Sequence, residues 1–102
     1  MSNSKLQYYL LICDKKMQKK FMNLMYEYEV RGINCEYARG SANAGCIAKA
    51  FGFESEEHKV LLSGLISTPK AIELTETLKS KYKFHDNNTG FAFSIPVEGL
   101  SV

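Results

Sequence analysis

The chain has 102 residues, of which 45 % are apolar and 24 % are charged, and its formal net charge is +2. This composition excludes collagen-like, low-complexity and mainly disordered chains, and no apolar run reaches the ~18 residues that span a bilayer. The small net charge provides little electrostatic attraction to nucleic acid or anionic lipid, so we expect a single domain (residues 1–102) with no nucleic-acid partner and no membrane insertion.

The first part of the chain predicts a strand, a helix and a second strand. Leu6–Cys13 is dense in Leu, Ile and Tyr, a composition typical of a strand. Asp14 is a capping residue for a helix over Lys15–Arg31, with Gly32 as its stop. Ile33–Ala38 then predicts a short strand. The residues at helical spacing on the apolar face of that helix are Met17, Phe21, Leu24, Met25 and Tyr28.

The later part predicts a third strand, a second helix and a fourth strand. Lys59–Ser67 favours a strand, and Thr68 followed by Pro69 indicates a helix start, because proline is well tolerated in the first turn. Phe91–Ile95 predicts the last strand, which Pro96 ends. The apolar stripe expected on the second helix consists of Ala71, Ile72, Leu74, Thr75, Leu78 and Tyr82.

This βαββαβ order predicts an α+β, ferredoxin-like fold, with a four-stranded antiparallel sheet and both helices on one face. The open face of such a sheet is polar in a monomer. The first strand is instead apolar on both sides, with Leu10 and Ile12 opposed to Leu11 and Cys13. We therefore expect a homo-oligomer that buries the open face; scattered exposed apolar residues on a monomer are the alternative.

Two further segments join these elements. Arg39–Glu57 is a long connection that begins with small residues and ends in an acidic patch, and connections of this length usually carry function. His85–Gly90 is rich in turn-forming residues.

The cysteines and histidines give no sign of metal or catalytic chemistry. No two of the three cysteines, Cys13, Cys35 and Cys46, form a CxxC pair, and the two histidines, His58 and His85, are far apart in the sequence. Neither a zinc site nor a catalytic nucleophile is therefore indicated. An odd number of dispersed cysteines is typical of reduced thiols in the cytoplasm. Cys13 and Cys35 are expected in the core. We expect no enzyme activity.

The most specific stretch is Thr89–Glu98, in which a Thr-Gly turn leads into an aromatic strand and then Ile-Pro-Val. With Arg31-Gly32-Ile33 and Arg39-Gly40-Ser41-Ala42, it resembles the PII-type nitrogen-regulatory signalling proteins, closest to the short PII-like branch. The resemblance implies a compact homotrimer of ferredoxin-like subunits with the open sheet faces inside. It also implies that residues 40–57 form the long effector loop, called the T-loop in that family.

The resemblance further implies a non-catalytic protein that senses a small metabolite in clefts between subunits. An adenine nucleotide is a candidate effector, no cofactor is certain, and the loop would regulate a target protein such as a transporter, an enzyme or a regulator. The implied ligand-binding residues are Asn34, Arg39, Gly40, Ser41, Asn88, Thr89 and Gly90. Phe91 stands where many members have a phosphate-binding lysine. A ligand-free oligomeric interaction or scaffold protein is the alternative.

The chemistry of these positions suits an anion. A turn rich in Asn, Thr and Gly can offer backbone N–H groups to phosphate, and the Arg39 guanidinium can pair with phosphate oxygens. A plain turn at Thr89 and Gly90, a surface arginine at Arg39 and a small loop residue at Ser41 are the alternatives.

Overall fold

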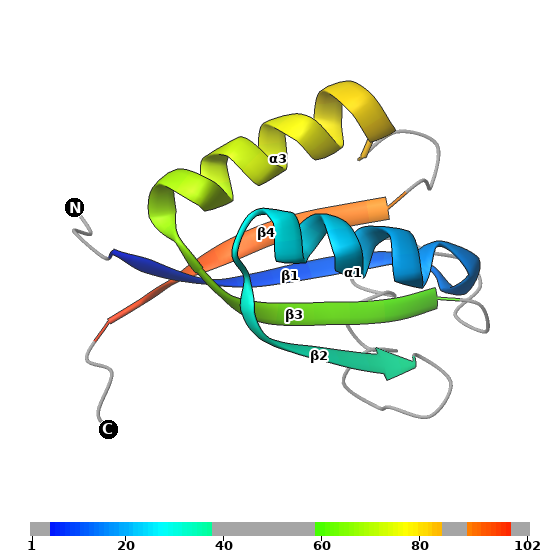
Figure 1. Ribbon diagram of the computed structural model, residues 1–102, viewed down its shortest axis with the longest axis horizontal. Helices are drawn as coiled ribbons and strands as arrows, with labels where there is room; N and C mark the ends of the chain where they lie inside the picture. The colour runs from blue at the N-terminus through cyan, green and yellow to red at the C-terminus, as the bar shows by residue number, and fades with distance from the viewer. Residues whose placement is uncertain (1–4, 38–58, 85–89, 99–102) are drawn as a thin grey trace.

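The computed structural model describes residues 5–37, 59–84 and 90–98. A sheet with strand order β2-β3-β1-β4 and antiparallel neighbours forms one layer, and the two α-helices of the described residues lie together on one face of it (Figure 1). This confirms the predicted ferredoxin-like α+β class. The elements are β1 (Leu6–Asp14), η1 (Lys15–Met17), α1 (Gln18–Glu27), β2 (Arg31–Tyr37), β3 (Lys59–Ser67), α3 (Thr68–Tyr82) and β4 (Gly90–Val97).

The first helix starts as predicted but ends earlier. The Asp14 carboxylate accepts a hydrogen bond from the backbone N–H of Lys16 at 3.1 Å, which confirms the cap. The predicted end at Arg31 is wrong, because Glu29 adopts a left-handed conformation (φ 63°) and breaks the helix after Glu27. The N–H of Val30 then bonds to the carbonyl of Met25, and Val30 enters the core. This pattern is a Schellman motif built without glycine.

Gly32 is therefore not a helix stop but a residue of β2. It has φ 63° and lies between Arg31 and Asn34, where the pairing of β2 with β3 shifts register. Such a bulge in an edge strand needs a residue that accepts positive φ, and glycine does so without steric cost.

Two predictions in the second half are also corrected. Ile72 is 61 % exposed and does not belong to the buried stripe of α3, which contains Ala71, Leu74 and Leu78. Pro96 lies inside β4 and pairs with Gln7, so it does not end the strand. Because β4 is an edge strand, the missing N–H of a proline is tolerated there.

The strand β1 is apolar on both sides, as predicted. Tyr9, Leu11 and Cys13 join the main core beneath the helices. Their neighbours Leu10 and Ile12 form a second buried cluster with Leu61 on the opposite face, against which Phe91 and Phe93 pack. The subunit therefore has two apolar layers, one on each side of a single sheet.

Gly90 begins β4 at a point of close approach. A Cβ atom built on it would lie 2.7 Å from the backbone oxygen of Ile12 and 2.8 Å from Cζ of Phe84. Phe84 is itself held by an edge contact with Phe21, with ring centroids 5.1 Å apart. A backbone oxygen cannot move aside cheaply, so this position requires glycine for packing alone.

We predict that Gly90→Ala destabilises the fold by about 1–3 kcal/mol, the usual cost of overpacking. Gly32→Asn is the matched control, because nothing lies within 4 Å of the Gly32 Cβ position and asparagine tolerates positive φ. The control should cost less than about 1 kcal/mol. Urea unfolding monitored by circular dichroism measures both variants, and equal losses would contradict the packing role of Gly90.

We also predict a specific loss of stability at alkaline pH. Burial, the largest cause, raises the pKa of the Cys13 thiol from its ordinary value of 9.0 to about 12. The unfolded chain therefore ionises first, and the stabilisation present below pH 9 is lost as the pH rises towards 12. Between pH 7 and pH 9.5, the wild type should lose about 0.8 kcal/mol more than Cys13→Ala in urea unfolding. Parallel losses in the two proteins would contradict this linkage.

Candidate functional site

The predicted site residues converge on one end of the sheet. There β1 and β2 end and β3 and β4 begin, and one row of paired residues crosses all four strands. In that row Tyr37 pairs with Val60, Val60 with Cys13, and Cys13 with Gly90. The end of β2, after which the predicted long loop begins, and the start of β4, which the predicted turn precedes, therefore lie at the same end of the fold (Figure 1).

The two strands that border these segments nevertheless lie on opposite edges of the sheet. The loop follows β2 and the turn precedes β4, and β2 and β4 are the two outer strands. With three strand spacings of roughly 4.8 Å each, the edges are about 14 Å apart. A ligand of nucleotide size that touches both segments within one subunit would have to lie across the ends of two central strands.

Of the predicted ligand-binding residues, the structure describes Asn34 and Gly90. Asn34 is exposed in β2 and pairs with Ser63, on the side of the sheet away from the helices, because its neighbours Ile33 and Cys35 contact the helix-side core. Gly90 is buried on the opposite edge, so the subunit does not bring the two together. The others lie outside the described residues: Arg39, Gly40, Ser41, Asn88 and Thr89.

Phe91 follows Gly90 at the start of β4, and its ring has a structural role here. It packs against the buried cluster of Leu10, Ile12 and Leu61 on the open face. The side chain therefore extends the apolar layer of that face rather than supplying a charge at the end of the sheet.

The two described cysteines are free thiols that face the helix-side core, as expected. Cys13 is fully buried and Cys35 is half-buried, and burial raises the pKa of both thiols. A thiol held in its neutral form is a poor nucleophile. Within residues 5–37, 59–84 and 90–98, no three His, Cys, Asp or Glu side chains group as a metal site would require.

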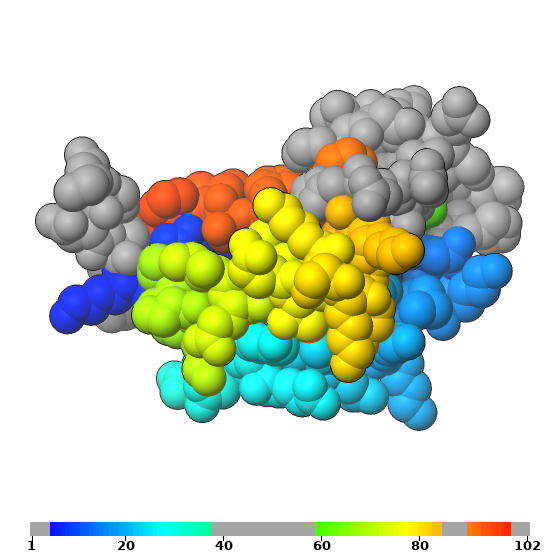
Figure 2. Space-filling model, turned by 90° about the horizontal axis from the view of Figure 1, so that it is seen from above, coloured from blue at the N-terminus to red at the C-terminus, as the bar shows by residue number. Residues whose placement is uncertain are grey.

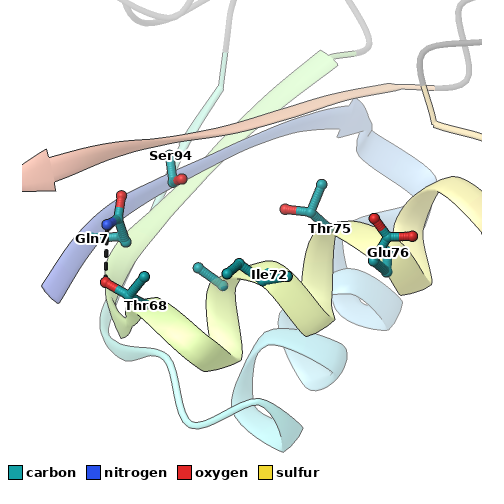
Figure 3. Close-up of a pocket in the computed structure, with 7 residues that line it drawn as sticks. Gln7, Thr68, Ile72, Thr75, Glu76 and Ser94 are labelled. Atoms are coloured by element: carbon teal, nitrogen blue, oxygen red, sulfur yellow. Dashed lines mark hydrogen bonds between the residues drawn. The ribbon is translucent and has the colours of Figure 1, made fainter. Parts of the chain in front are cut away.

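A groove between α3 and β4 was not anticipated from the sequence. It encloses about 240 Å³ and lies towards the other half of the sheet (Figure 3). Its floor includes Gln7, a buried amide whose Nε2 donates to the Thr68 hydroxyl at 3.0 Å. The Thr75 hydroxyl on its wall is hydrogen-bonded to the Tyr9 hydroxyl at 2.7 Å. The remaining lining residues are Ala71, Ile72, Glu76 and Ser94.

This groove presents hydroxyl and amide groups and one carboxylate, but no cation. Such a lining suits neutral polar groups rather than phosphate. The one sequence signal for it is Gln7, a polar residue in an otherwise apolar strand whose side chain points to the helix side. The helices that the structure describes include none that is both long enough and apolar enough to span a bilayer.

Neither a protein-family model nor a curated protein sequence matches this chain. Several solved structures do match it in fold. The chain superposes on a PII-like signalling protein from Thermus thermophilus with a TM-score of 0.66 and 16 % identity, covering 95 % of this chain and 90 % of that one. It also superposes on CPII, a nitrogen regulatory PII-like protein from Thiomonas intermedia.

The CPII structure bound to ADP, AMP and bicarbonate gives a TM-score of 0.62 at 12 % identity and covers 90 % of this chain and 89 % of that one. A second CPII structure, bound to ADP, AMP and acetate, gives a TM-score of 0.64 at 12 % identity, and the match covers 95 % of this chain and 90 % of that one. Likeness over nearly the whole length of both chains at such low identity establishes shared architecture. The chain has the fold of the PII-like signalling proteins.

Proposed function

We propose that this protein is a non-catalytic PII-like signalling protein that senses a small metabolite between subunits of a homotrimer. The observation that supports the proposal is the strand order, which puts the end of β2 and the start of β4, the strands that border the predicted loop and turn, on opposite edges of the sheet. When two copies lie side by side, the β2 edge of one meets the β4 edge of the next. Arg39 of one subunit and Gly90 of its neighbour would then face a shared cleft.

The open face of the sheet supports an assembly of several subunits. Leu10, Ile12 and Leu61 form an apolar cluster there that is already buried within the subunit, and beyond it Ile95, 49 % exposed, pairs with Tyr8, 38 % exposed, towards the far end of β4. Burying a large aliphatic side chain contributes ~1.5–3 kcal/mol, so packing the exposed Ile95 and Tyr8 side chains of several subunits against each other stabilises an oligomer. A closed trimer with the faces turned inward satisfies this requirement.

An adenine nucleotide is the effector we favour. CPII, with the same fold, is found with ADP and AMP. In this chain the phosphate would meet the Arg39 guanidinium and the backbone N–H groups of residues 88–90. Phe91 contributes no charge, so the site holds phosphate with fewer cations than a lysine-bearing relative would.

The regulatory mechanism we propose is a shift in the conformers of the loop over residues 40–57. A ligand bound at the base of this loop favours the conformers that contact it. A cytoplasmic target protein (a transporter, an enzyme or a regulator) then recognises those conformers. A ligand-free scaffold of the same oligomeric state is the second candidate, and the experiments below separate the two.

Light scattering after size-exclusion chromatography should give three times the subunit mass of 11.5 kDa. Ile95→Glu places a charge on the open face and should shift the protein to the monomer. Ile72→Glu is the matched control, since Ile72 is equally an exposed isoleucine but lies on α3, on the helix side. A monomeric wild type, or dissociation by both variants, would contradict the proposed assembly.

A thermal-shift screen with ATP, ADP, AMP, cyclic dinucleotides, 2-oxoglutarate and bicarbonate should identify the effector. A ligand present at 100 times its Kd adds ~2.7 kcal/mol to stability and raises the Tm accordingly. Arg39→Ala should weaken the binding of that ligand, whereas Arg31→Ala, at the other end of β2, should leave it unchanged. The absence of a shift with every compound would favour the scaffold function.

A further inference from the structure

Seven of the 13 basic residues gather at one end of the helical layer. Four lie at the start of the first helical segment, in η1 and the first turn of α1, and three lie in the last turn of α3 and at the residue that follows it. The two helices run in opposite directions, so these ends are neighbours (Figures 1 and 2). All seven are exposed, and together they form the lysine end: Lys15, Lys16, Lys19, Lys20, Lys79, Lys81 and Lys83.

Tyr82 joins the two groups of lysines. The ammonium of Lys20 from α1 lies 5.0 Å from the centroid of the Tyr82 ring, and that of Lys81 from α3 lies 5.9 Å from the same centroid. Phe21 fixes the ring by an edge contact at 5.2 Å. The lysines of both helices therefore belong to one continuous basic surface.

Apart from the capping residue Asp14, the acidic residues of the helices lie elsewhere. Neither η1 nor α1 has an acidic residue in its first turn, and Glu27 stands at the opposite end of α1. Glu73 and Glu76 precede the basic last turn of α3. Positive charge at a helix N-terminus opposes the helix dipole, so the lysines of η1 and α1 do not serve helix stability.

We propose that the lysine end docks the protein on an anionic membrane surface, by contact with lipid headgroups and without insertion. This surface lies on the helical layer, at the same end of the subunit as the proposed effector cleft, and is formed by other residues. Lysine near an anionic leaflet strengthens binding about fivefold per residue. The lysine end contains lysine and no arginine. Lysine ammonium groups suit diffuse attraction to a charged plane, whereas arginine favours the bidentate recognition that is common in nucleic-acid complexes.

The aromatic neighbours of the patch favour a lipid surface. Tyr26, 58 % exposed, shares a shallow hollow of about 460 Å³ on the outer face of α1 with Lys15, Lys16 and Lys19. Tyrosine beside lysine is typical of segments that lie at the membrane–water interface, because the ring has an apolar body and a polar tip. Tyr37, whose ring lies under the Lys15 ammonium at 5.1 Å, is exposed at the same end.

The test is sedimentation of the full chain with vesicles of phosphatidylcholine alone and with about 30 % phosphatidylserine, at about 50 mM salt. Binding should require phosphatidylserine and disappear at about 0.5 M salt. Lys16→Gln/Lys19→Gln should lower the partition coefficient about 25-fold. The matched control, Lys5→Gln/Lys70→Gln, makes the same change in net charge away from the patch and should lower it by less than about threefold.

Three results would overturn the proposal. The first is absence of binding to phosphatidylserine vesicles. The second is an equal loss in the two double variants, which would show an effect of net charge alone. The third is tighter binding to a short DNA duplex than to the vesicles at the same salt concentration, which would identify nucleic acid as the occupant. Thermal unfolding of both variants confirms that they remain folded.

Discussion

The strand β1 is the element on which the rest of the structure depends, because it is central and apolar on both sides. Its odd-numbered side chains pack against the helices. Leu11 and Cys13 lie in the main core, and the Tyr9 hydroxyl is hydrogen-bonded to the Thr75 hydroxyl of α3. Its even-numbered side chains Leu10 and Ile12 support a second cluster on the other face. The helices cover only the first set, and the other face continues beyond the second set to the exposed side chains of Tyr8 and Ile95, whose burial would make association favourable.

The strand order that makes β1 central also separates the parts of the candidate site. β2 and β4 are the outer strands, and the segments with the predicted anion-binding residues adjoin them on opposite edges. Assembly and ligand binding would therefore depend on the same contact between neighbouring subunits. The groove lined by Gln7, Thr75 and Ser94 lies towards the other end of β4 and has a different polarity.

Much of the fold could be predicted from the sequence, because alternation in strands and helical spacing are local patterns. The misses occurred where long-range packing overrode a local signal. Glycine at position 32 indicated a helix stop, yet Glu29 takes the left-handed conformation because Val30 must enter the core. Pro96 indicated a strand end, but an edge position tolerates it. Ile72 had helical spacing and still lies outside the buried stripe.

The sequence by itself determined the order of the elements, the two apolar faces of β1 and the segments with the chemistry to hold an anion. Only the tertiary structure decided which of these segments are neighbours and where the charges gather. A net charge of +2 indicated no electrostatic partner. Antiparallel packing of α1 and α3 nevertheless brings two lysine-bearing ends together, because the lysines of η1 and α1 lie at the start of the first helix and most of those of α3 lie at its end. The net charge is a sum over the sequence and carries no information about where the charges lie in the fold.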